Sequence, residues 1–369
     1  MTQKVKPSQD PSAHLQLLCF QLSLTCNAAC RACAYDCHPS RGPVIPEEKV
    51  NEILEQAEDI EMNRTIAFTG GEPFLHYNLL KRLSTRVKDR LGYDLTVSTN
   101  CFWAATPERA RRIVGEMSEL GLAYLLVSVD DFHQEYIDLE RVENGVQAAV
   151  DQGVRCVLQG METRSSRKMD WYREHMDIPS DPELIQWNPT PSDPVGRAAK
   201  DIPADDLLLN WRKQAGCCSM LRAFIVNADG AVSNCCGSAN GGLPHIGNAF
   251  EEPMADIFKR VNADPLLNAL AAWGGPSLLM DILRERGFTE YAERSYTSPC
   301  HACHSIFHDP RAMEIVQNQL ALRRAELVAT RLFAQKQHMN WKLGGEKEEL
   351  YVLGTWLDDP AQSAARSAA

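Results

Sequence analysis

Short apolar runs alternate with longer amphipathic segments between residues 15 and 200. The short runs are typical of strands, whereas apolar positions in the longer segments recur every three or four residues, which indicates helices. Strands and helices that alternate in this way form parallel βα units. We therefore predict an α/β fold with a partial (β/α)6 TIM-type barrel, although the pattern also fits an open parallel sheet. The predicted strands are residues 15–24, 64–70, 93–100, 124–130, 154–162 and 184–190, and the predicted helices are residues 46–60, 77–92, 106–121 and 140–153.

The alternation stops at residues 193–206, where Pro, Gly and Asp gather. Residues 207–310 are less regular and contain six of the thirteen cysteines, and the end of the chain is of low complexity. We predict three parts: a barrel over residues 15–200, a small α+β domain over residues 207–310, and a C-terminal helix with a disordered tail over residues 311–369.

Composition limits the class of protein. The net charge of −11 argues against nucleic-acid and anionic-membrane partners. No apolar run approaches the ~20 residues that cross a bilayer. The N-terminus is polar and has no signal-peptide core. We expect a cytoplasmic protein, in which grouped cysteines indicate metal or redox chemistry rather than disulfides.

The first cysteine group lies in LTCNAACRACAY, where Cys26, Cys30 and Cys33 have C-x3-C-x2-C spacing. Three thiolates on a [4Fe–4S] cluster leave one iron open for a substrate or cofactor. A zinc site, with Cys37 or His38 as its fourth ligand, is the alternative.

A second motif, FTGGEPFLH, ends the second predicted strand. Gly70 and Gly71 allow a close main-chain approach to a ligand, and Glu72 offers an acceptor for an ammonium group. A lone Gly-Gly would indicate only a turn. Because ligands bind at the carboxyl ends of parallel strands, both motifs lie where a site is expected.

Together these motifs resemble the radical SAM superfamily. The resemblance implies that Cys26, Cys30 and Cys33 bind a [4Fe–4S] cluster and that S-adenosylmethionine occupies the open iron. It implies that Gly70, Gly71 and Glu72 bind the methionyl amino group of that cofactor. An external one-electron reductant, of flavodoxin or ferredoxin type, would drive cleavage to a 5′-deoxyadenosyl radical, which removes a hydrogen atom from the substrate.

Further positions follow from the same resemblance. Ala32 stands where many members carry an aromatic residue or His, and its main chain is expected to contact adenine, with Tyr35 as a substitute ring. His133 is a weaker candidate for substrate contact. PVGRA, residues 194–198, resembles a segment of members with extra clusters, although Arg197 could equally form a surface ion pair. The strand-end residues expected to contact the cofactor are Ser98, Asn100, Ser128 and Asp130.

The second cysteine set flanks a predicted hairpin, with Gly230 in its turn. It resembles the auxiliary-cluster domains called SPASM and twitch, and implies one auxiliary [4Fe–4S] cluster of the shorter twitch form because no cysteine follows Cys303. Zinc is the alternative. The expected ligands are Cys218, Cys235, Cys300 and Cys303, with Cys217 and Cys236 as competing choices.

Members with auxiliary clusters include many maturases of ribosomally made peptides, so we expect a peptide substrate. Only 25 residues precede Cys26, so a separate peptide-recognition protein or direct binding would be needed. A dehydrogenase or epimerase of a small molecule (a sugar, aminoglycoside or amino-acid derivative) and a non-catalytic electron carrier are the alternatives. Cys37, Cys101 and Cys156 are candidate hydrogen-atom donors.

Overall fold

The structure is a computed structural model. It describes residues 17–57, 65–212, 223–233, 235, 246–264, 266–267, 270 and 275–322. Three of the expected or competing auxiliary ligands, Cys217, Cys218 and Cys236, lie outside the described residues, as does most of the predicted C-terminal segment.

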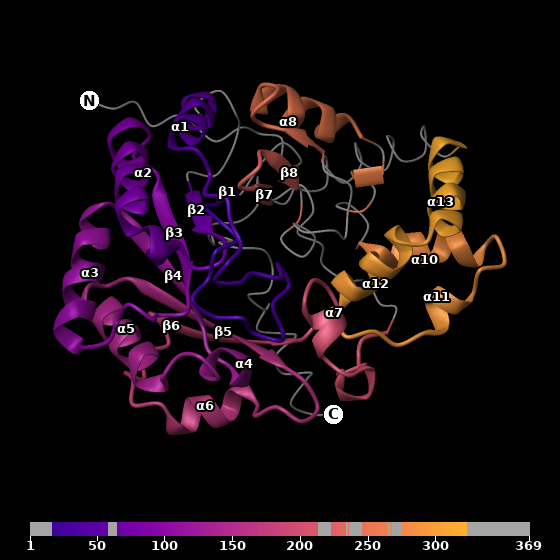
Figure 1. Cartoon of the computed structure of the whole chain (residues 1–369). Coiled ribbons are helices and arrows are strands. Elements are labelled where there is room, and N and C mark those ends of the chain that lie inside the picture. The colour runs from indigo at the N-terminus through magenta and orange to yellow at the C-terminus, as the bar shows by residue number, and fades with distance from the viewer. Residues whose placement is uncertain are drawn as a thin grey trace, which may run out of the picture.

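One sheet organises the described chain, with strand order β6-β5-β4-β3-β2-β1-β7-β8-β9 (Figure 1). The first six strands are parallel and neighbours in chain order, as predicted. This sequential order fits a partial barrel or an open sheet, and it differs from that of a doubly wound sheet, in which the order reverses at a switch point. The strands are β1 (Leu17–Gln21), β2 (Thr65–Thr69), β3 (Asp94–Thr99), β4 (Leu122–Ser128), β5 (Arg155–Glu162), β6 (Ile185–Pro191), β7 (Ala223–Val226), β8 (Ala231–Ser233) and β9 (Gly247–Asn248).

The connecting helices cover one face of this sheet (Figure 1). All four predicted helices are present, whereas the short helices α4 and α6 were not predicted. None of the described helices is long and apolar enough to cross a membrane. The helices are α1 (Glu47–Gln56), α2 (Tyr77–Arg90), α3 (Pro107–Glu119), α4 (Asp131–Gln134), α5 (Leu139–Asp151), α6 (Met169–His175), α7 (Ala198–Asp201), α8 (Met254–Ala263), α10 (Pro276–Arg284), α11 (Glu290–Glu293), α12 (Pro299–Phe307) and α13 (Pro310–Leu322).

The two faces of the strands differ in chemistry. Leu18 and Phe20 of β1 point to the helices and join the main apolar core. The alternate residues Cys19 and Gln21 point to the other face, because side chains alternate along a strand. We call this other face the inner face. In the parallel register, Gln21 is paired with Thr69, and the inner face becomes polar toward the carboxyl ends of the strands.

The predicted hairpin is confirmed: β7 and β8 are antiparallel, and Gly230 in their turn has φ +86°. The hairpin also does something that was not predicted. Strand β7 pairs in parallel with β1, from Leu17 opposite Ala223 to Phe20 opposite Val226. The sheet therefore runs without interruption from the barrel segment into the segment that carries the second cysteine set.

Removing the Phe20 ring tests the central position of β1. Phe20 is fully buried, and its ring centroid lies 6.1 Å from that of Phe68. We expect Phe20→Ala to lower the free energy of unfolding by about 3–5 kcal/mol, measured by urea denaturation. Leu75→Ala removes a side chain that is 38% exposed, and should cost less than about 0.5 kcal/mol. Equal losses in the two variants would contradict this view of the core.

Candidate active site

The first cysteine loop leaves β1 and folds back on itself. Isolated bridges pair Thr25 with His38 and Ser23 with Val44. The Cys26 N–H donates to the His38 carbonyl at 3.3 Å. The loop is thus closed at its base, and Cys26 lies at the closure.

The loop brings its three thiols together in an apolar environment. Cys26 and Cys30 are buried, and Cys33 is partly buried beside them. They share one apolar cluster with Phe132 and Leu207. Burial is the main cause that raises the pKa of Cys26 and Cys30, and the nearby Cys33 adds to it in both cases. Three cysteine thiols that lie together in an apolar loop fit a [4Fe–4S] cluster, because thiolates are soft ligands that suit iron–sulfur clusters.

The three thiols differ in acidity. Burial raises the pKa of Cys26 to about 12 and also raises that of Cys30. In contrast, hydrogen bonds from Cys37, including its main-chain N–H at 3.3 Å from the sulfur, lower the pKa of Cys33 to about 6. Hydrogen bonding to Cys37 therefore favours the thiolate form of Cys33, whereas burial favours the protonated forms of Cys26 and Cys30.

Of the two fourth ligands considered for a zinc site, Cys37 lies beside the Cys33 sulfur, whereas His38 is at the surface. That ring is exposed, and its Nδ1 lies 2.8 Å from the Ser40 hydroxyl. Within the described part of the chain, no group of three or more His, Cys, Asp and Glu side chains is gathered tightly enough to hold a metal ion. Because a [4Fe–4S] cluster binds each cysteine at a separate iron, its thiolates stand farther apart than the ligands of one zinc ion.

Gly70 and Gly71 approach the cysteine loop itself. The Gly71 N–H donates to the Ser23 carbonyl at 2.8 Å, and the Glu72 N–H donates to the Thr25 carbonyl at 3.0 Å. A Cβ atom on Gly71 would lie less than 3.0 Å from the Thr25 carbonyl oxygen. A Cβ atom on Gly70 would likewise lie less than 3.0 Å from the Ser23 carbonyl oxygen. We expect this close approach to serve a ligand, and the structure adds that the nearest neighbours of both glycines are main-chain atoms of the cysteine loop.

The Glu72 carboxylate joins the ends of β2 and β3. It accepts hydrogen bonds from the Phe74 N–H at 3.1 Å, the Thr99 hydroxyl at 2.9 Å and the Asn100 N–H at 2.8 Å. It is 1% exposed, and burial raises its pKa to about 7 despite these bonds. Since a carboxylate offers about four acceptor positions, one remains for an ammonium group.

Asn100 contacts the cysteine loop from the end of β3. Its Nδ2 donates to the Asn27 side chain at 3.0 Å and lies 3.9 Å from the Cys26 sulfur. Ser98 lies two residues before Asn100, on the inner face of β3. Ser128 lies on the inner face of β4, and its partner in β5 is Gln159. The structure thus places Asn100 beside the thiols, and Ser98 and Ser128 deeper on the inner face.

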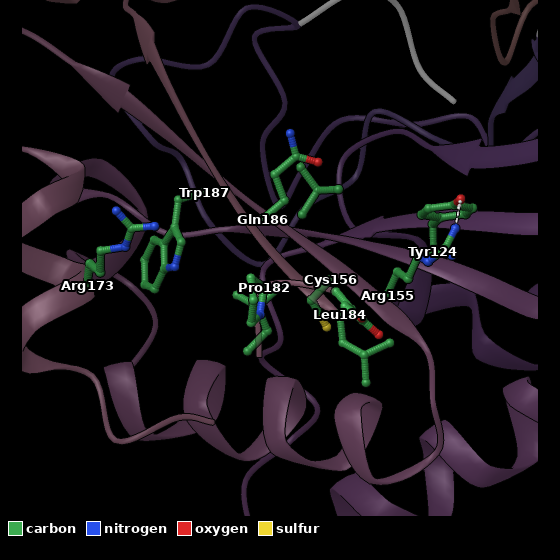
Figure 2. Close-up of a pocket in the computed structure, with 11 residues that line it drawn as sticks. Tyr124, Arg155, Cys156, Arg173, Pro182, Leu184, Gln186 and Trp187 are labelled. Carbon is green, nitrogen blue, oxygen red and sulfur yellow. Dashed lines mark hydrogen bonds between the residues drawn. The ribbon is translucent and has the colours of Figure 1, made fainter. Parts of the chain in front are cut away.

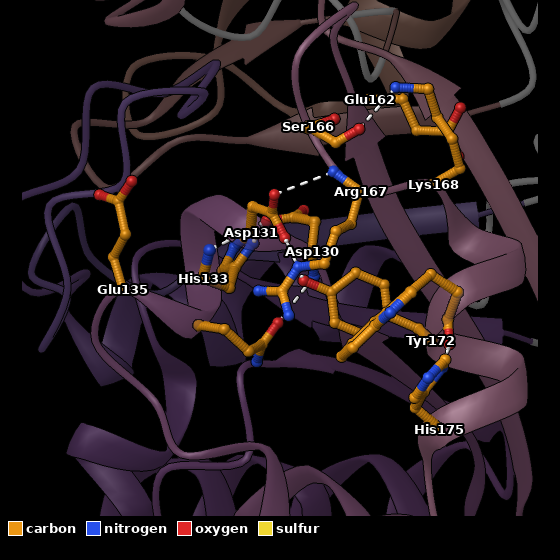
Figure 3. Close-up of polar contacts among 12 residues, drawn as sticks. Asp130, Asp131, His133, Glu135, Glu162, Ser166, Arg167, Lys168, Tyr172 and His175 are labelled. Atoms are coloured by element: carbon orange, nitrogen blue, oxygen red, sulfur yellow. Dashed lines mark hydrogen bonds and ion pairs between the residues drawn. The ribbon is translucent and has the colours of Figure 1, made fainter.

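Asp130 and His133 form a hydrogen-bonded pair at the end of β4 (Figure 3). Asp130 accepts from the His133 ring at 2.8 Å and from the Met161 N–H at 2.9 Å, so its carboxylate joins the ends of β4 and β5. Burial lowers the pKa of His133, but the charges of Asp130, Cys33 and Glu72 outweigh that effect and raise it. His133 therefore faces the same negative site as the cysteine loop.

A neighbouring network holds the segment after β5 (Figure 3). Asp131 accepts from Arg167 at 2.6 Å and from the Tyr172 hydroxyl at 2.6 Å. The guanidinium of Arg167 also lies 4.3 Å from the centroid of the Trp171 ring. These contacts fix α6 against α4 and serve the structure around the site.

The remaining loop residues pack at its edges. Ala32 is buried among the thiols, and Tyr35 packs on both the loop cluster and the inner face at Cys19. The candidate hydrogen-atom donors Cys101 and Cys156 point away, into the core on the helix side of the sheet, while Cys37 lies against Cys33. The structure therefore places only Cys37 of these three at the site.

Arg197 is a residue whose place the sequence left open. It is 9% exposed and donates to the carbonyls of Cys30 at 3.1 Å and Cys37 at 2.5 Å, so the surface alternative is wrong. Its Nε also pairs with Asp36 at 3.0 Å. Sequence pattern does not single out Asn27, Asp36 or Asp193, although Asp193 closely follows a strand, as other site residues do.

The described part of the second cysteine set lies on two elements. Cys300 and Cys303 are three residues apart in α12 and so share one side of that helix, and Cys235 closely follows β8 and is buried. Ser298 caps α12 through the N–H groups of Cys300 and His301.

A separate pocket of about 290 Å³ lies at the amino ends of β5 and β6 (Figure 2). Tyr124, Arg155 and Trp187 are among the residues that line it. The cysteine loop is at the opposite ends of the parallel strands, so this pocket is not part of the candidate site.

Together, the fold and the site define a parallel-sheet domain with a three-cysteine loop at the carboxyl ends of its strands. Residues 20–161 match the model of the Radical SAM superfamily, so the chain contains a radical SAM domain. The "Putative peptide biosynthesis protein YydG" of Bacillus subtilis (strain 168) is 27% identical over 125 residues, which are 34% of this chain and 39% of that protein. The match thus spans about two fifths of that curated relative.

Several solved structures are also similar. BtrN in complex with AdoMet and 2-DOIA has a TM-score of 0.46 at 15% identity, over 72% of this chain and 89% of that one. Native anSMEcpe with bound AdoMet and Cp18Cys peptide has a TM-score of 0.46 at 14% identity, over 83% and 99%. Streptococcus suis SuiB bound to S-adenosylmethionine has a TM-score of 0.42 at 14% identity, over 70% and 68%.

Gly71→Ala tests the contact between the two motifs. The new Cβ would overlap the main chain at Thr25, so we expect lower iron retention after anaerobic reconstitution and a lower midpoint of unfolding. Gly115→Ala is the matched control, because a Cβ at that position in α3 meets nothing within 4 Å. Iron retention that is equal in the two variants would contradict the proposed contact.

Glu72→Gln tests the raised pKa of the Glu72 carboxyl. Because burial lifts the pKa of Glu72 from 4.5 to about 7, the folded state binds more protons between these values. Its contribution to stability is therefore largest below pH 4.5 and is lost as the pH rises through about 7. We expect the glutamine variant to flatten this part of the stability profile, measured by urea denaturation of the metal-free protein. An unchanged slope would contradict the assignment.

Proposed function

We propose that this chain is a radical SAM enzyme that reductively cleaves S-adenosylmethionine and abstracts a hydrogen atom from a peptide, as a maturase of a ribosomal peptide product. When bound, the [4Fe–4S] cluster and S-adenosylmethionine supply the 5′-deoxyadenosyl radical. The observation that carries the proposal is the convergence of Cys26, Cys30 and Cys33 with the Gly71–Glu72 main chain at one end of the sheet.

The chain's own residues orient and protect this site. Glu72 keeps one acceptor position for the cofactor's amino group, and three hydrogen bonds hold its carboxylate in place. Asn100 positions the loop beside Cys26. Phe132 and Leu207 pack around the thiols and exclude water. An external flavodoxin- or ferredoxin-type protein would supply the electron.

The main chain of Ala32 is proposed to contact adenine, and Gly70 to shape the amino-group site with Gly71. Ser98, Ser128 and Asp130 are proposed to line the cofactor and substrate site. Of these, Asp130 acts through His133, because its own carboxylate is occupied by the chain.

An auxiliary [4Fe–4S] cluster is proposed at Cys218, Cys235, Cys300 and Cys303. Two features of the described residues support it. Cys300 and Cys303 share one side of α12, and Cys300 lies in the first turn, where main-chain N–H groups and the helix dipole favour an anionic group.

The peptide substrate is supported by the name of the Bacillus subtilis relative and by the inner face. Gln21, Gln159 and Asn188 place neutral amides there. Such groups match the amide groups of a peptide. Binding is proposed to be direct or through a separate peptide-recognition protein.

Iron and product analysis tests this function. With dithionite, the reconstituted protein should convert S-adenosylmethionine to 5′-deoxyadenosine and hold about eight irons, falling to about four in Cys26→Ala/Cys30→Ala/Cys33→Ala, which should form no product. Cys156→Ala, on the helix side of the sheet, is the control and should behave as wild type. Intact clusters without any 5′-deoxyadenosine would instead indicate an electron carrier.

A further inference from the structure

One short segment touches both cysteine-bearing elements. It runs from Asp193 to Arg197, just after β6, and we name it the strap. We propose that the strap sets the position of Cys300 and Cys303 relative to the first cysteine loop, and so fixes the spacing between the two iron–sulfur centres. This inference rests on the proposed function for the existence of the second centre.

The C-terminal end of the strap is hydrogen-bonded to the first cysteine loop. The Arg197 main-chain N–H donates to the Cys33 carbonyl at 2.9 Å, and its guanidinium donates to the carbonyls of Cys30 and Cys37. These bonds hold the main chain of the loop at three points, two of them at the proposed ligands Cys30 and Cys33.

Gly196 allows the strap to lie close to the main chain of the first cysteine loop. It has φ +58°, in the left-handed region that favours glycine. A Cβ atom there would lie less than 3.0 Å from the carbonyl oxygens of Ala34 and Cys33. The strap therefore lies directly on the loop main chain, with no space for a side chain between them.

The N-terminal end of the strap holds α12. Asp193 accepts from the Ser298 hydroxyl at 2.7 and 2.8 Å and from the Thr297 hydroxyl. Ser298 in turn accepts from the Cys300 N–H at 3.0 Å. One carboxylate thus orients the first turn of the helix, where Cys300 lies.

The strap is short and turned. The Val195 N–H donates to the Asp193 carbonyl at 2.8 Å. Four residue steps span at most about 14 Å even when extended. Two cysteine-bearing elements fixed to the ends of such a segment cannot move apart independently, so their spacing is a property of the strap.

Strap variants test this inference in the full-length, reconstituted protein. Asp193→Ala and Ser298→Ala should each weaken the magnetic interaction between the two reduced clusters in the electron paramagnetic resonance spectrum. The proposed ligands of the first cluster, Cys26, Cys30 and Cys33, are unchanged in these variants. Ser298→Thr keeps the hydroxyl and should restore the wild-type spectrum. Thr106→Ala is the matched control, because Thr106 caps α3 through its hydroxyl ahead of a proline, as Ser298 does in α12.

The outcomes separate the two proposals. If the wild-type protein holds about eight irons and only Asp193→Ala and Ser298→Ala have altered spectra, the result supports the proposed role of the strap. Wild type with about eight irons and spectra unchanged in those variants overturns the strap but leaves the proposed function intact. Wild type with about four irons overturns the auxiliary centre, and the strap's role with it.

Discussion

The main-chain contact between Gly71 and the cysteine loop is the constraint on which the rest of the site depends. It extends the pairing of β1 and β2 beyond the ends of both strands, through Gly71 to Ser23 and Glu72 to Thr25. Because no side chain fits between these segments, the loop position follows the sheet directly. The parallel sheet thus determines where the three thiols lie, which is how a scaffold pre-organises a reactive site.

Buried charged side chains also fix the site at the ends of several strands. Glu72 joins β2 to β3, Asp130 joins β4 to β5, and Arg197 holds the loop from the end of β6. Burying a charge is costly unless hydrogen bonds compensate, and each of these groups has at least three such bonds or ion pairs. The same bonds that satisfy the charges therefore fix the geometry around the thiols.

Much of the fold could be predicted from the sequence, because the six parallel strands carry a strong local pattern. Local pattern also singled out Cys26, Cys30, Cys33 and Glu72, which the structure brings to one end of the sheet. It could not identify the partners of Arg197, which lie about 160 residues earlier in the chain, nor the pairing of β7 with β1. It also pointed to a close approach at Gly71, and the structure adds that the Thr25 main chain is one group that comes close there. The start of β4 at Leu122, two residues before the predicted one, follows from a register shift beside Leu95.

The pairing of β7 with β1 has a consequence for how the two cysteine sets relate. An independent domain joined by a linker could change its distance from the barrel. Here the hairpin before Cys235 is part of the barrel sheet, and α12 is bonded to the residue that follows β6. Cys235 is therefore attached to the sheet through the hairpin beside β1, and Cys300 and Cys303 are attached through Asp193 after β6. Two attachments restrict rotation as well as distance, so these three cysteines keep a defined orientation toward the first loop.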